Sequence, residues 1–154
     1  MPIHKLIDGE LRPYAGDSPI EVTLAAWRDG ARPNSGRCAL LLPNDVPVAE
    51  VAEALDLFDA VILEFPVFKD GRAYSQARLL RERYGFKGEL RARGHVLRDQ
   101  ALFMRRAGFD AFEIDEGEAA SFREAFAEQS FVYQAAADGA EPVWRSRAAR
   151  AAAA

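Results

Sequence analysis

From Cys38 onward the chain alternates, four times, between a short apolar run and a longer segment with helical spacing. The apolar runs are too short for helices, whereas the segments between them repeat apolar side chains every three or four residues. The expected strands span residues 38–42, 60–65, 89–93 and 110–115, and the expected helices span residues 48–58, 74–84, 96–107 and 118–129. Regular β-α alternation predicts a parallel sheet with right-handed crossovers, and therefore an α/β fold.

Helical spacing also predicts which side chains face the core. In the first two helices these are Val48, Val51, Ala52, Leu55, Phe58, Tyr74, Ala77, Leu80 and Tyr84. In the last two they are Val96, Gln100, Phe103, Met104, Ala107, Ala119, Phe122 and Phe126.

Charged residues occupy every second position near the ends of three expected strands. They are Glu64, then Arg91 and Arg93, then Glu113. A doubly wound sheet has helices on both faces and would bury these charges beneath a helix. A curved sheet with helices only outside places them in a concave interior. We therefore expect four β-α units in a half-barrel-like parallel sheet, with a flavodoxin-like doubly wound sheet as the alternative.

The chain divides into three expected parts. Residues 1–36 form an N-terminal extension, in which Asp8-Gly9 predicts a hairpin within residues 3–12 and residues 22–27 predict a short helix. Residues 37–135 form the β/α domain. Residues 136–154 form a C-terminal tail that we expect to be partly disordered.

Composition excludes several classes of function. A net charge of −4 argues against a dedicated nucleic-acid binder. No apolar run approaches the roughly 20 residues that cross a membrane, and no signal region opens the chain, so we expect a cytoplasmic protein. Cys38 is the only cysteine, which excludes an intrachain disulfide and a four-thiolate cluster from one chain. We expect it to be a small buried apolar residue; the alternative is a thiolate activated by Arg37.

Charge is unevenly spread along the chain. Residues 69–106 hold 11 Lys and Arg against 4 Asp and Glu, and residues 107–142 hold 9 acidic residues against Arg123 alone. We expect these halves to neutralise each other within the fold; the alternative is a basic face that meets an acidic partner.

The loop after the second expected strand is the richest in groups for chemistry. Lys69 and Arg72 supply cations, Ser75 a hydroxyl, and the helix that begins nearby supplies free backbone N–H groups. Such a set suits a small oxyanion such as sulfite, sulfate or phosphate. The structural alternative makes Asp70 a helix cap and leaves the two cations in solvent.

Strand residues and the following loop supply the other candidates. Arg91 lies two residues before Arg93 on one face, and both need carboxylates or a bound anion. One interpretation is an ionic network of Arg91 and Arg93 with Glu64 and Glu113; the other makes Arg93 an anchor for substrate or partner. His95 stands where a general acid or base would, directly after the third expected strand.

No cofactor is identifiable. His4 and His95 lack zinc-ligand spacing, and Asp115-Glu116 is a weak magnesium candidate, so we expect no metal site. The chain has no Gly-x-Gly-x-x-Gly fingerprint for a dinucleotide and no nucleotide-phosphate loop.

Three stretches, Phe65–Ser75, Gly85–Gln100 and Arg105–Phe112, resemble a bacterial family known as domain of unknown function 934. The resemblance covers nearly the whole chain and is tightest from Phe65 to Phe112. Members of that family tend to be encoded beside sulfite or nitrite reductase. The Arg98-Asp99-Gln100 sequence matches the family pattern. We expect Asp99 and Gln100 to have a structural role at the start of the third helix, with Asp99 near the helix N-terminus and Gln100 facing inward; the alternative makes Asp99 a catalytic candidate beside His95. The family more often has an acidic residue in place of His95.

The resemblance implies an accessory protein of assimilatory sulfite (or nitrite) reduction, acting through the reductase or its reductant supply. The residues themselves allow two alternatives. One is a small oxyanion-binding enzyme or carrier with a basic site at the C-terminal ends of the strands. The other is an obligate homodimer with a structural role only.

Overall fold

The computed structural model describes residues 1–33, 36–128, 132–145 and 148, and these residues form one seven-stranded sheet. The strands lie in the order β2-β1-β7-β6-β5-β4-β3, and β3 to β7 are parallel, whereas β1 is antiparallel to both neighbours. The strand bounds are β1 Ile3–Ile7, β2 Glu10–Pro13, β3 Ile20–Thr23, β4 Cys38–Leu42, β5 Ala60–Phe65, β6 Glu89–Gly94 and β7 Ala111–Glu113.

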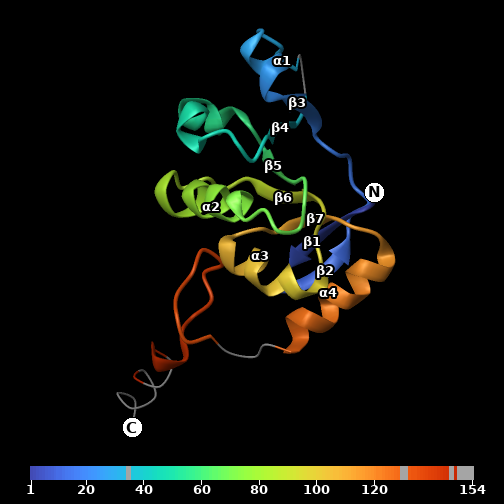
Figure 1. The fold of residues 1–154 in the computed structure, drawn as a ribbon, viewed down its shortest axis with the longest axis vertical. Coiled ribbons are helices and arrows are strands. Elements are labelled where there is room, and N and C mark those ends of the chain that lie inside the picture. Colours follow the sequence, from blue (N-terminus) through green and yellow to red (C-terminus); the bar gives the residue numbers. More distant parts are fainter. Residues whose placement is uncertain (34–35, 129–131, 146–147, 149–154) are drawn as a thin grey trace.

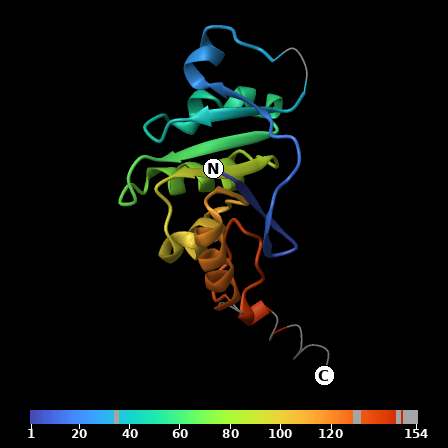
Figure 2. The same ribbon diagram turned by 90° about the vertical axis from the view of Figure 1, so that its right-hand side faces the viewer.

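Short helical segments connect the parallel strands, and a longer helix follows the last strand. They are α1 Leu24–Arg28, the 3-10 turns η1 Val48–Glu50 and η2 Ala52–Leu57, α2 Arg72–Arg78, the π turn η3 Leu79–Arg83, the 3-10 turn η4 Arg98–Gln100, α3 Ala101–Ala107 and α4 Glu116–Glu128. The order from β3 to β7 never reverses, so right-handed crossovers place these segments on one face of the sheet. Figures 1 and 2 show the helices along the outside of a curved, open sheet. The α/β fold with a mostly parallel sheet is confirmed, and the strand order favours the half-barrel-like form.

The helix-covered face of the sheet is the main core. Leu40, Leu63, Leu90 and Phe112 project from successive strands into this core and are fully buried. Phe112 packs edge-on against Phe122 of α4, with ring centres 5.3 Å apart. A second, smaller group of buried apolar side chains lies on the other face; it consists of Ala39, Ala60 and Ile62.

The N-terminal residues are part of the same sheet. Asp8 and Gly9 have φ angles of 52° and 82° and form the turn between β1 and β2. Such positive angles are easily adopted by glycine and tolerated by Asp, which is why Asp-Gly marks a tight hairpin turn. The division of the chain at residues 36 and 135 stays a prediction. Residues 146–147 and 149–154 of the expected tail lie outside the described residues.

Three helix expectations need correction. Residues 22–27 are not one helix, because Ile20–Thr23 form the parallel strand β3 and α1 begins at Leu24. Residues 48–58 form two 3-10 turns, although Val48, Val51, Leu55 and Phe58 are buried as expected. Residues 74–84 begin their helix two residues earlier, at Arg72, and finish as a π turn.

The buried face of the third helix also differs from the expectation at Gln100, which is only half-buried, and at Phe103. Phe103 is 70% exposed, whereas Ala101, Met104 and Ala107 are buried. The chain enters α3 through the 3-10 turn η4, which winds by three residues per turn and so rotates the helix relative to a continuous α-helix. This rotation turns Phe103 outward.

None of the helices formed by the described residues has the length and apolar character that a membrane crossing requires.

Candidate functional site

The carboxyl ends of β4 and β5 meet at a polar cluster around Asp70. The Asp70 carboxylate accepts a hydrogen bond from Asn44 Nδ2 at 2.8 Å and one from Arg72 Nη2 at 2.6 Å. It also accepts from the backbone N–H of Arg72, at the start of α2. The hydrogen bonds from Arg72 and Asn44 hold the pKa of Asp70 well below its usual range. Because Asp70 neutralises Arg72, the expected oxyanion loop has lost one of its two cations to an internal pair.

The other residues predicted for this edge do not converge on one point. Lys69 is exposed, with Nζ 5.6 Å from the ring centre of Phe68. Ser75 is exposed and lies beside Arg78 on α2. Neither the Lys69 nor the Ser75 side chain has a hydrogen bond or ion pair with another described residue.

The two catalytic candidates, His95 and Asp99, are also exposed, and neither forms an ion pair with a described residue. His95 follows Gly94, which has a φ of 107° and lies so close to the Phe65 carbonyl that a Cβ would approach its oxygen to 2.4 Å. The turn after β6 therefore requires glycine for packing. The candidate site residues stay predictions.

The concave face of the sheet carries a network of ion pairs centred on two arginines. Arg93 makes two hydrogen bonds to Glu113, through Nε and Nη2, each 2.6 Å long. Arg91 is fully buried and donates to Glu89 Oε1 at 2.7 Å and to Glu113 Oε1 at 3.2 Å. Glu21 accepts from Arg93 at 2.5 Å. Two arginines of the same strand, Arg91 and Arg93, thus share the Glu113 carboxylate. Such pairing offsets the cost of removing their charges from water.

The network is closed and electrically balanced. Lys5 Nζ completes it at 2.6 Å from Glu89 Oε2. The cations are Lys5, Arg91 and Arg93, and the carboxylates are Glu21, Glu89 and Glu113.

Electrostatics within the network follow from burial and pairing. Burial would raise the pKa of Glu113, but the hydrogen bonds and charges of Arg93 and Arg91 outweigh it and hold the pKa below the usual value. The hydrogen bond to Glu113 raises the pKa of Arg93. Arg93 is thus held by two carboxylates and is not free to anchor an anion without displacing one of them.

Sequence reasoning found part of this network. Arg91, Arg93 and Glu113 are members, but Glu64 makes no ion pair with a described residue, although it lies in register with Arg93. Glu89 continues the Arg91–Arg93 alternation by two residues, a signal that could have found it. Glu21 gave no such signal, because its strand was not predicted.

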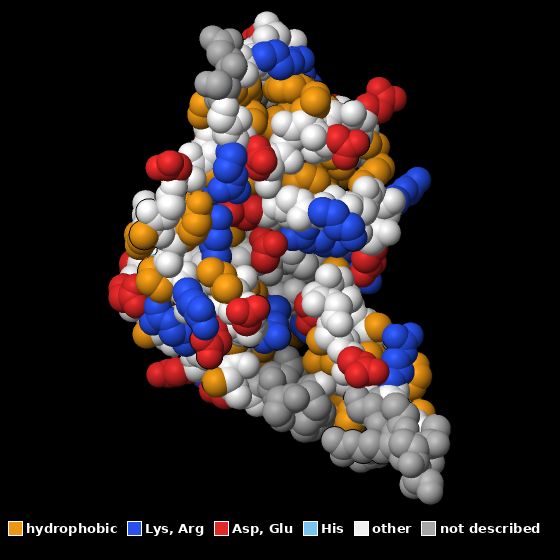
Figure 3. All heavy atoms as spheres, turned by 180° about the vertical axis from the view of Figure 1, so that it is seen from behind, with side chains coloured by type: hydrophobic (Ala, Val, Ile, Leu, Met, Phe, Trp, Pro, Cys, Tyr) orange, Lys and Arg blue, Asp and Glu red, His pale blue; other side chains and the backbone are white. Residues whose placement is uncertain are grey.

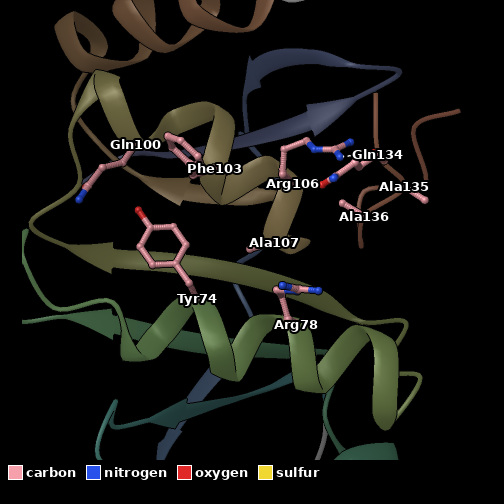
Figure 4. A pocket seen from close by; sticks show the side chains of 9 residues that line it. All are labelled: Tyr74, Arg78, Gln100, Phe103, Arg106, Ala107, Gln134, Ala135 and Ala136. Atoms are coloured by element: carbon pink, nitrogen blue, oxygen red, sulfur yellow. Dashed lines mark hydrogen bonds between the residues drawn. The ribbon is translucent and has the colours of Figure 1, made fainter. Parts of the chain in front are cut away.

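A pocket of about 690 Å³ lies between α2 and α3 (Figure 4). The Tyr74 ring and Phe103 line one end, and Arg78 and Arg106 line the other. Burial raises the pKa of Tyr74 to about 12, so its hydroxyl is protonated at neutral pH. Arg106 pairs with Asp138 at 3.1 Å. The pocket is therefore apolar with a neutralised polar rim.

Large apolar side chains are exposed in the loops that follow β5 and β6 and on α3. Val67, Phe68, Leu97 and Phe103 are 55%, 48%, 47% and 70% exposed, and we refer to them as the edge patch. Gln100 joins the loops that carry them, because its Nε2 donates to the Phe68 carbonyl at 2.7 Å and its Oε1 accepts from Leu97 N at 3.3 Å.

Charges from the basic and acidic segments pair with each other across the fold. Arg81 pairs with Asp110 at 2.9 Å, and Arg98 pairs with Glu128. Figure 3 looks onto the amino ends of the parallel strands and shows both signs interspersed there. The uneven charge of the sequence is thus largely neutralised by folding, as expected.

Cys38 is buried at the start of β4. Burial is the larger cause that raises the pKa of its thiol, and the negative charge of Asp59 adds to it. A raised pKa disfavours the thiolate. In the part of the chain that the structure describes, no group of three or more His, Cys, Asp or Glu is arranged to hold a metal ion.

The sequence matches the model of one known family. The family model described as "Bacterial protein of unknown function (DUF934)" matches residues 39–144, which run from β4 to the C-terminal segment. No curated protein matches the chain.

Proposed function

The chain belongs to the bacterial DUF934 family, whose description assigns no activity, and we propose a function for it. We propose that it is an accessory protein of assimilatory sulfite (or nitrite) reduction that docks onto the reductase or its reductant supply. The choice of partner rests on the family resemblance described above, because members of that family tend to be encoded beside sulfite or nitrite reductase. The choice of docking, rather than catalysis, rests on the edge patch.

The edge patch is the observation that carries the proposal. Its four large apolar side chains are exposed, three in the loops that follow β5 and β6 and the fourth on α3. Contiguous exposed apolar surface, rimmed by polar groups, is typical of protein interaction sites. Phe103 has the features of a central anchor, since it is a large aromatic residue, 70% exposed, beside the pocket between α2 and α3.

The same edge offers little for catalysis. Arg72 is neutralised by Asp70, and Arg93 by Glu113 and Glu21. His95 has no carboxylate in the described residues that would orient its ring as a general base. The alternative of an oxyanion-binding enzyme at this edge would therefore have to break internal pairs.

The test is direct binding to purified sulfite reductase, measured by biolayer interferometry. We expect Phe103→Glu to weaken binding by about tenfold or more, because it places a charge at the centre of the apolar contact. Leu57→Glu is the matched control: Leu57 is 62% exposed on η2, away from the edge patch, and its substitution should leave the affinity unchanged.

Three results would contradict the proposal. One is no binding of wild-type protein to the reductase or to its electron-donating partner. Another is equal weakening by Phe103→Glu and Leu57→Glu, which would indicate a general charge effect. The third is a stable wild-type dimer that Phe103→Glu dissociates, because the edge patch would then be a self-contact and the proposed docking would be wrong.

A further inference from the structure

Arg105 differs from every other cation in the described residues. It is the one Lys or Arg that is partly buried and has no carboxylate within salt-bridge distance. Its only described partner is the ring of Phe126, with Cζ 5.8 Å from the ring centre. A partly desolvated guanidinium without an anion is costly, and proteins normally pair it.

Arg105 lines a pocket of about 380 Å³ at the amino ends of β6 and β7. This edge is opposite to the edge patch. The hairpin turn closes one side: a Cβ built on Gly9 would lie 3.9 Å from Arg105 Nη2. Lys87 lines the pocket from the loop before β6; it is exposed and also has no carboxylate partner in the described residues.

The two carboxylates of the pocket are already engaged. Asp110 accepts from Arg81 Nη2 at 2.9 Å and from Leu90 N at 2.8 Å. Asp138 is held by Arg106 and by the backbone N–H of Ala140.

Among the described residues, three cations and two carboxylates thus line the pocket, and the unmatched positive charge belongs to Arg105 and Lys87. Arg81 is largely engaged, since its charge is paired with Asp110 and three of its other N–H groups donate to the carbonyls of Phe86, Gly88 and Gly108.

We propose that this pocket binds a small oxyanion, a sulfate, sulfite or phosphate group, with Arg105 as its principal ligand and Lys87 as the second cation. Such a group accepts hydrogen bonds from the fork of an arginine and gains from a nearby ammonium. The pocket is of the size that small ligands occupy. The site goes beyond the docking function, because it lies at the other edge of the sheet and involves none of the edge-patch residues.

The experiment is isothermal titration calorimetry of the full chain with sodium sulfate, sulfite and phosphate, each to about 10 mM, with chloride holding the ionic strength constant. Three variants are compared. Arg105→Gln removes the principal charge and keeps most of the side-chain length, and Lys87→Gln removes the second charge at an exposed position. Arg83→Gln is the matched control, because Arg83 is exposed, has no carboxylate partner in the described residues, and lies outside the pocket.

We expect saturable binding of one of the three anions to wild-type protein. Arg105→Gln should weaken it by about tenfold or more, and Lys87→Gln by severalfold, while Arg83→Gln leaves it unchanged. The preferred anion separates a sulfur oxyanion from a phosphate group. If Arg105→Gln does not fold, Lys87→Gln against Arg83→Gln decides the question.

The proposal is overturned if none of the three anions binds wild-type protein, or if all three variants weaken binding equally, which would indicate long-range charge only. Neither result bears on docking at the edge patch, which the Phe103→Glu experiment tests separately.

Discussion

Glu21 on β3 accepts a hydrogen bond from Arg93 on β6, with Oε1 and Nη2 2.5 Å apart, although β4 and β5 lie between the two strands. In a flat sheet three strand spacings would separate their backbones by about 14 Å, more than the two side chains can comfortably span. The pair is therefore a direct sign that the sheet curves toward this face. Ile62, which lies on the same face of β5 between them, is fully buried.

The Glu21–Arg93 pair should contribute little to stability. Glu21→Gln is expected to lower the free energy of unfolding by about 0.5–1 kcal/mol, because the Glu21 side chain is 39% exposed and Arg93 keeps Glu113. Urea unfolding followed by circular dichroism measures this. A loss as large as that of a buried pair would mean that the pair is more desolvated than its exposure indicates.

Removing Glu113 should be far more damaging. Glu113→Gln leaves the fully buried Arg91 without one of its carboxylates and weakens the pairing of Arg93, so we expect a loss of about 3–5 kcal/mol. The same urea experiment, with Glu21→Gln as the control, gives the difference between the two carboxylates. Similar losses for both variants would show that the network does not depend on Glu113.

Stability should fall in acid partly through Glu113. Its pKa is lower in the folded state than the usual value, so its stabilisation is present above the usual carboxyl pKa and is lost as pH falls through the lowered pKa. Wild-type protein should therefore lose more stability than Glu113→Gln between about pH 6 and about pH 3. Burial raises the pKa of Asp110, which acts in the opposite sense, but Asp110 is present in both proteins and cancels in the comparison. Parallel pH profiles of unfolding free energy would contradict this assignment.

Gly94 should not tolerate a side chain. Gly94→Ala places a Cβ 2.4 Å from the Phe65 carbonyl oxygen at a φ of 107°, and we expect a loss of more than about 2 kcal/mol. Gly71→Ala is the control, since Gly71 has a φ of −86° and open space around it, and should change stability by less than about 1 kcal/mol. Thermal melts of the two variants suffice, and equal melting temperatures would contradict the close approach.

The rotation of α3 predicts opposite effects for neighbouring residues. Met104→Ala should cost about 2–5 kcal/mol, because Met104 is fully buried. Phe103→Ala should change the free energy of unfolding by less than about 0.5 kcal/mol, since its side chain is largely in solvent. Chemical denaturation of both variants measures this directly. A large loss of unfolding free energy in Phe103→Ala would mean that Phe103 faces the core, as helical spacing alone predicted.

Much of the architecture was predictable from local patterns. Strand β5 begins at Ala60 and ends at Phe65, as its apolar run indicates, and the alternation of Arg91 and Arg93 with apolar neighbours predicted a charged, concave face. These features are encoded by residues close together in the chain, since side chains alternate along a strand and recur every 3.6 residues along a helix. The type of helix was less predictable, because the same apolar spacing is compatible with α, 3-10 and π turns.

From Cys38 onward the sequence by itself determined the order of strands and helices, the apolar face of each strand and the presence of like charges that need partners. Only the tertiary structure decided which partners they receive: Glu21 reaches Arg93 because the sheet curves, and Arg105 has no carboxylate partner among the described residues. The reason is that pairing depends on distances between residues remote in the chain. Those distances are set by sheet curvature and loop packing, and a local pattern of residues does not contain them.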